Sequence, residues 1–81
     1  MIIAAAMKID GVVRALPAPA RHGDIIHKYP MPEHEHGEQG FIDDRMGFVG
    51  RATAARIAVG GGQVNAGKLI APPDLFSEDL W

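Results

Sequence analysis

The first nine residues of the chain are apolar except for Lys8. Within residues 2–9, every second side chain from Ile3 onward is apolar and Lys8 lies on the opposite face, which is typical of a half-buried strand. Asp10-Gly11 follows directly, and this dipeptide favours a two-residue type I′ turn. The pattern therefore predicts a β-hairpin in which residues 12–16 form the return strand.

The two-residue turn also predicts the register of this hairpin. The expected pairs are Ile9 with Val12, Met7 with Arg14, and Ala5 with Leu16. Arg14 would then lie in an otherwise apolar row. Its side chain either extends to solvent past the edge of the sheet or points into a binding site for an anion.

Proline and glycine residues divide the rest of the chain. They end two helical patterns, the first before Pro30 and the second before Gly60. The expected elements are a helix over 21–29, a second hairpin of 40–42 and 47–49, a helix over 51–59, and a short strand within 63–70. The acidic and apolar tail from Leu75 to Trp81 would dock on the core or on a neighbouring subunit. Together these elements predict an α+β fold of two β-hairpins and two short helices, with a docked C-terminal segment, in one domain over residues 1–81.

Composition narrows the classes of function and assembly. The chain has 81 residues, so its core is small, and it has no cysteine for disulfides or thiolate metal sites. Association into a homodimer or a larger oligomer is a remaining common way to stabilise such a domain. The formal net charge of −2 argues against binding of bulk nucleic acid. Because no stretch approaches about 20 apolar residues, we expect no membrane span.

The densest group of reactive side chains lies at the predicted start of the first helix, where Arg21, His22 and Asp24 are the catalytic candidates. A histidine acting as general acid or base, with a guanidinium near the developing charge, suffices for phosphodiester cleavage without a metal or other cofactor. The same groups suit a phosphate-binding pocket without catalysis. They also suit a solvated helix start in which His22 caps the helix or packs against it.

Polar and aromatic residues beside glycines and turns are candidates for ligand binding, because amides and carboxylates can read a base or ribose and an aromatic ring can stack on a base. The candidates are Arg14, Glu38, Gln39, Phe41, Arg51, Gln63, Ser77 and Glu78. Phe41 also fits a place in the core. The alternating His34 and His36 suggest a metal site, but the flanking prolines and charges favour a solvated loop, so no metal is predicted.

Several segments, taken in order, resemble a group of small tailed-phage proteins. They are Arg21-His22-Gly23-Asp24-Ile25-Ile26, Gly37-Glu38-Gln39-Gly40-Phe41, Phe48-Val49-Gly50-Arg51 with the helix that follows, Gly62-Gln63, and the segment Leu75 to Trp81. The resemblance spans nearly the whole chain. Members of the group often carry a second histidine or an asparagine where this chain has Gly23, which puts a two-histidine mechanism at that position in doubt.

The resemblance implies a function in evading host immunity, because small oligomeric phage proteins with polar pockets include several that neutralise nucleotide immune signals. The leading expectation is metal-independent cleavage of a cyclic dinucleotide in a pocket around Arg21 and His22. One alternative is sequestration of a cyclic dinucleotide or of an ADP-ribose-derived signal. Another is a protein-interaction inhibitor or structural phage component that uses the C-terminal tail. In each case we expect the chain to act in the cytoplasm of the host cell.

Overall fold

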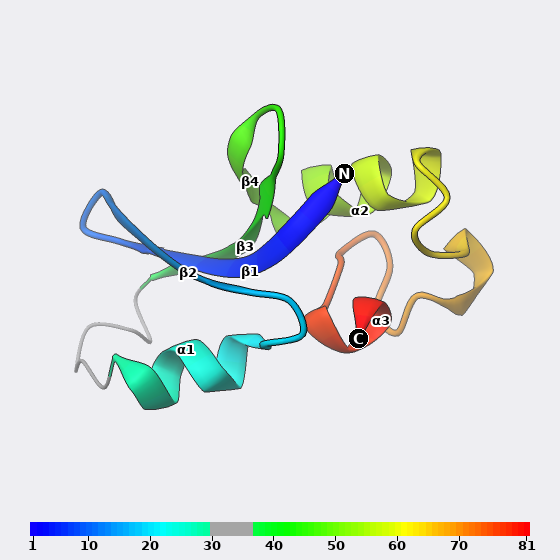
Figure 1. Cartoon of the computed structure of the whole chain (residues 1–81). Helices are drawn as coiled ribbons and strands as arrows, with labels where there is room; N and C mark the ends of the chain where they lie inside the picture. Colours follow the sequence, from blue (N-terminus) through cyan, green and yellow to red (C-terminus); the bar gives the residue numbers. More distant parts are fainter. Residues whose placement is uncertain (30–36) are drawn as a thin grey trace.

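A computed structural model describes residues 1–29 and 37–81 of the chain (Figure 1). In chain order the elements are β1 (Ile2–Ile9), β2 (Val12–Pro17), α1 (His22–Lys28), β3 (Glu38–Asp43), β4 (Gly47–Gly50), α2 (Arg51–Gly60), the 3₁₀ helix η2 (Ala66–Lys68) and α3 (Ser77–Leu80). The strands form one antiparallel sheet in the order β2-β1-β3-β4. The predicted α+β fold is confirmed, and the two hairpins are joined because β1 pairs with β3.

The first hairpin forms as its turn sequence predicts. Asp10 and Gly11 have φ angles of 51° and 79°, and a type I′ turn requires positive φ at both positions. All three predicted residue pairs between β1 and β2 are present. The local turn chemistry therefore sets which side chains of β2 face the helices.

The second hairpin turns around the loop 44–46, and Asp43 shapes that loop. Its Oδ2 accepts hydrogen bonds from the backbone N–H groups of Arg45 and Met46, both at 3.0 Å. Its Oδ1 accepts from the α-amino group of Met1 at 2.7 Å. The Met1 ammonium and these two N–H groups hold the pKa of the Asp43 carboxyl below its ordinary value. The carboxylate thereby ties the start of β1 to the β3–β4 loop.

One face of the sheet carries the hydrophobic core. Side chains of β1, β3 and β4 on this face pack with α1, α2 and the C-terminal tail. The largest fully buried apolar side chains are Phe41, Ile2, Met7, Ile25 and Leu75. Figure 1 shows α1 and α3 on the same side of the strands. The buried alanines Ala54, Ala55 and Ala58 allow the backbone of α2 to approach the sheet closely.

The expected short strand within 63–70 is wrong. Residues Ala66–Lys68 form η2, in which Asn65 Oδ1 accepts from the N–H of Gly67 at 2.9 Å. The Gln63 amide instead pairs with the main chain of Ile2, accepting from its N–H at 2.7 Å and donating to its carbonyl at 2.9 Å. The Gln63 side chain therefore provides hydrogen-bond partners for the backbone of Ile2, where β1 extends past the end of β2.

Candidate functional site

The C-terminal segment is docked, as predicted, and it organises the polar side chains around it. The indole Nε1 of Trp81 donates to the carbonyl of Ala20 at 2.8 Å. The guanidinium of Arg21 donates to the main-chain oxygen of Trp81 through Nε, at 2.8 Å, and through one terminal nitrogen. Arg21 thus holds the end of the chain against the start of α1.

His22 lies beneath this tail, with 6% of its surface exposed. Its Nε2 is 2.7 Å from the carbonyl oxygen of Gly40, and its Nδ1 is 3.2 Å from Oγ of Ser77. The imidazole also meets the ring of Phe41 edge to face, with centroids 5.0 Å apart. Both ring nitrogens are therefore engaged inside the protein.

The Gly40 carbonyl and the lowered pKa of His22 together indicate which ring nitrogen carries a proton. A carbonyl oxygen can only accept, so Nε2 carries a proton and donates it to Gly40. Burial lowers the pKa of His22, and the nearby Arg51 lowers it further, although the Gly40 carbonyl and Glu78 act in the opposite direction. In the neutral ring, Nδ1 then accepts from the hydroxyl of Ser77. This arrangement positions Ser77, and it leaves no ring nitrogen of His22 free to exchange a proton with a bound ligand.

Arg51 begins α2 and connects three elements of the fold. Its Nη1 donates to the carbonyl of Leu75 at 2.7 Å, and its Nη2 donates to Oε1 of Gln39 on β3. The guanidinium stacks over the ring of Phe76, with 4.2 Å between the guanidinium carbon and the ring centroid. We call Arg51, Gln39, Phe76 and Glu78 the Arg51 cluster.

The Arg51 cluster keeps unused hydrogen-bonding capacity. A guanidinium carries five N–H donors, and within residues 1–29 and 37–81 those of Arg51 beyond the two bonds above have no partner. The Nε2 amide of Gln39 is free in the same sense, because only its Oε1 is bonded there. Burial lowers the pKa of Arg51, but Glu78 raises it and the guanidinium stays charged. An exposed carboxylate therefore lies near a half-buried cation that still has donors to offer.

The other predicted site residues occupy different places. Asp24 Oδ2 accepts from the backbone N–H of Arg21 at 2.7 Å and so caps α1. Phe41 has no exposed surface and belongs to the core. Arg14 packs over Tyr29, 4.7 Å from the ring centroid, and its buried Nε has no hydrogen-bond partner among the described residues. The amide of Gln63 is hydrogen-bonded to the main chain of Ile2. Glu38 lies on the face of the sheet opposite to the Arg51 cluster. The loop of His34 and His36 lies outside the residues that the structure describes.

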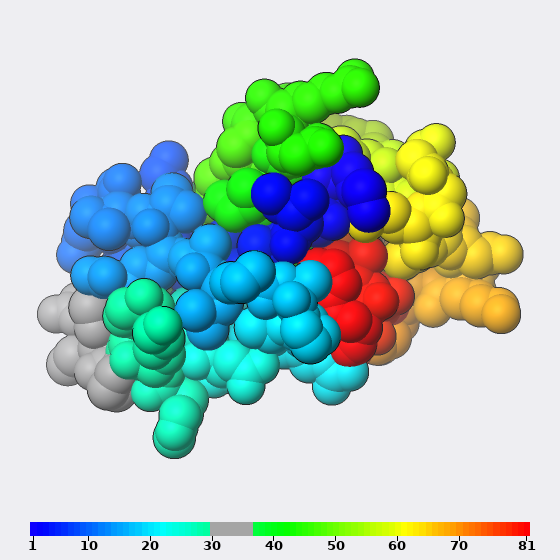
Figure 2. Space-filling view, in the orientation of Figure 1, coloured from blue at the N-terminus to red at the C-terminus, as the bar shows by residue number. Residues whose placement is uncertain are grey.

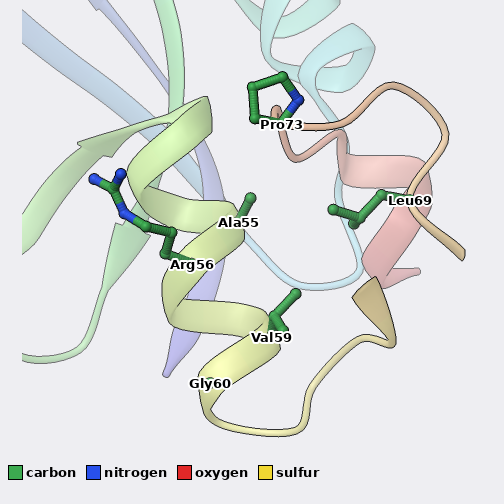
Figure 3. Close-up of a pocket in the computed structure, with 6 residues that line it drawn as sticks. All are labelled: Ala55, Arg56, Val59, Gly60, Leu69 and Pro73. Carbon is green, nitrogen blue, oxygen red and sulfur yellow. The ribbon is translucent and has the colours of Figure 1, made fainter. Parts of the chain in front are cut away.

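Two features of the structure were not predicted from the sequence. Phe76 supports Arg51, although its place in the apolar tail suggested only packing. The second feature is an apolar cavity of about 350 Å³ between α2 and the segment that follows η2, lined by Ala55, Arg56, Val59, Gly60, Leu69 and Pro73 (Figure 3). In Figure 3, Ala55 and Val59 face Leu69 across the gap, while the Arg56 guanidinium points away from it. The i, i+4 spacing of two apolar residues on α2 was the available signal for this cavity.

The fold and the cluster define a small α+β protein whose polar residues are assembled by its C-terminal segment. The family model of the phage T4 y16D protein matches residues 1–81, and the chain therefore belongs to this family of phage proteins. No curated protein and no solved structure matches the chain. Within the described ranges, no helix is long and apolar enough to cross a membrane.

Proposed function

We propose that this phage protein binds a nucleotide immune signal of the host and sequesters it without cleaving it. The observation that carries the proposal is the Arg51 cluster. A guanidinium stacked on Phe76 and oriented by Gln39 is pre-organised to hold phosphate oxygens through its remaining donors. Glu78, an exposed acceptor nearby, suits a ribose hydroxyl or a base N–H group.

The state of His22 favours sequestration over cleavage. A general acid or base must reach the reacting proton of the substrate, directly or through one water. Here the imidazole is buried and bonded at both nitrogens, to Gly40 and Ser77. Its engagement instead stabilises the tail that carries Phe76 and Glu78, so we assign His22 a positioning role in the binding site.

A binding and recovery experiment tests the proposal. Binding of 3′,3′-cyclic GMP-AMP and of cyclic ADP-ribose to the protein is measured by calorimetry. Each nucleotide is then incubated with an excess of the protein, and the protein is denatured by heat to release what it holds. We expect saturable binding of at least one of these two ligands and recovery of intact nucleotide after heating. Accumulation of linear or hydrolysed product would contradict sequestration and would return weight to cleavage. Absence of binding to both would favour a protein-interaction or structural role.

Two conservative variants locate the site. Arg51→Lys keeps a cation but loses the planar fork, and Glu78→Gln removes an exposed charge, so each should raise Kd by about tenfold or more. The matched controls are Arg56→Lys, on the exposed surface of α2, and Glu38→Gln, on the other face of the sheet. These controls should leave Kd unchanged. Equal effects of a variant and its control would place the binding site elsewhere.

A further inference from the structure

The face of the sheet opposite the core carries its own pattern of side chains. Residues paired across antiparallel strands share a face, and one row of this face runs Val13, Lys8, Glu38. The next row is Ala15, Ala6, Gly40, Gly50, and the third is Pro17, Ala4, Ile42, Phe48. In the part of the chain that the structure describes, α1, α2 and the tail pack on the other face. This uncovered face is therefore apolar at its centre, with one cation and one anion side by side.

Small residues form the floor of the uncovered face, and larger side chains lean over it. A Cβ atom added to Gly40 would lie 2.8 Å from Cζ of Phe48, and one added to Gly50 would lie 3.1 Å from Oε2 of Glu38. Val13 is 41% exposed, and Phe48 and Ile42 are half-buried. Figure 2 shows the two hairpins, blue and green, as separate lobes with a concave stretch between them. The apolar side chains that reach solvent on this face are thus Val13 and, in part, Ile42 and Phe48, whereas Ala6 and Gly40 at its centre are buried.

The two charged residues of this face, Lys8 and Glu38, do not pair with each other. Lys8 and Glu38 are direct partners across β1 and β3, yet among the described residues they form no ion pair within 4.0 Å. Lys8 Nζ instead lies 5.9 Å from the ring centroid of Phe48, and the carboxylate of Glu38 leans toward Gly50. When two identical faces are related by a two-fold axis, the cation of each copy can lie opposite the anion of the other. A face that carries one cation beside one anion is therefore complementary to itself.

The geometry points to the uncovered face as the docking surface for a second copy of this chain. The two sheets stack face to face, with Lys8 of each copy paired to Glu38 of the other around the apolar Val13 and Phe48. An amphipathic sheet is stable when its exposed apolar face is covered by a second layer, and stacked sheets pack about 10 Å apart. The opposite charges select a copy of the same face over a partner of uniform charge. This inference is independent of the proposed nucleotide binding.

Charge reversal tests the pairing. Sedimentation equilibrium of the full chain, from about 1 to about 100 µM, should show a reversible dimer that weakens with added salt. Lys8→Glu and Glu38→Lys should each raise the dimer dissociation constant by about tenfold or more, because like charges then face each other twice in the dimer. Lys68→Glu, the same charge change on the exposed η2, should leave the dissociation constant at the wild-type value.

Mixing the two single variants gives the decisive measurement. A Lys8→Glu chain facing a Glu38→Lys chain recovers two attractive pairs, so the mixture should form a heterodimer although neither variant self-associates. Circular dichroism of each variant alone confirms that it is folded, which separates lost association from lost structure. A monomeric wild type throughout the range would overturn the inference. So would dimers that both variants leave intact, an equal effect of Lys68→Glu, or a mixture that stays monomeric.

Discussion

Acidification should weaken the docking of the C-terminal tail through His22. The neutral imidazole donates to the carbonyl of Gly40 and accepts from the hydroxyl of Ser77. Protonation of Nδ1 would remove the acceptor that Ser77 uses and would bury a cation near Arg51. The perturbation is a fall in pH, and the comparison variant is His22→Gln. This variant cannot titrate, but its amide N–H can still donate toward Gly40.

The sign and size of the effect follow from the lowered pKa of His22. The unfolded chain binds a proton near the ordinary value of 6.5, and the folded chain binds it only at a lower pH. Stability from His22 is therefore fully present above pH 6.5 and is lost as the pH falls from there to the folded-state pKa. Over that window the free energy of unfolding should drop by at most about 1.4 kcal/mol per pH unit, the limit for one proton. Below the folded-state pKa, this contribution should level off.

Urea denaturation, followed by the fluorescence of Trp81, measures this directly from about pH 5 to about pH 7.5. The wild-type free energy of unfolding should fall with acidification, and His22→Gln should be less stable near neutrality but flatter with pH. The difference between the two profiles isolates His22, because the other titrating groups are common to both chains. Parallel profiles would refute the assignment of a buried neutral imidazole.

The parts of the fold that local chemistry determines were predictable from the sequence. Asp10-Gly11 determines the type of turn between β1 and β2. A two-residue turn permits a single pairing register, and that register places Arg14 on the face of the sheet that carries the core. The end of α2 was also predictable, because the glycines that follow Val59 readily adopt the backbone conformations found at helix ends. The pairing of β1 with β3 was beyond such reasoning, since it joins residues far apart in the chain. The strand expected within 63–70 does not form, because the Gln63 side chain already satisfies the main-chain N–H and carbonyl of Ile2 at the start of β1.

The sequence indicated which side chains could bind a ligand, but not which of them the fold would bring together. Three of the predicted ligand-binding residues, Gln39, Arg51 and Glu78, lie together in the Arg51 cluster, whereas most of the other candidates lie elsewhere in the fold. The sequence could not indicate that both ring nitrogens of His22 form hydrogen bonds within the protein. One of the partners, Ser77, lies 55 positions away in the chain and is buried by the fold. A histidine beside an arginine looks reactive until its burial is known.

Two further predictions test contacts that hold the sheet. Gln63→Ala should lower the free energy of unfolding by about 2–4 kcal/mol, because the buried N–H and carbonyl of Ile2 lose their partner; weakened nucleotide binding at unchanged stability would contradict this structural role. Gly40→Ala should cost about 3 kcal/mol or more, since the added Cβ would lie 2.2 Å from the carbonyl oxygen of Val49, which the β3–β4 pairing holds in place. The matched control is Gly23→Ala in α1, where an added Cβ meets no atom within 4 Å. That control should raise stability by about 0.5 kcal/mol, because alanine loses less conformational entropy in a helix. Thermal melts of both glycine variants decide the matter, and similar melting temperatures would show that Gly40 is not required for the close approach of β3 and β4.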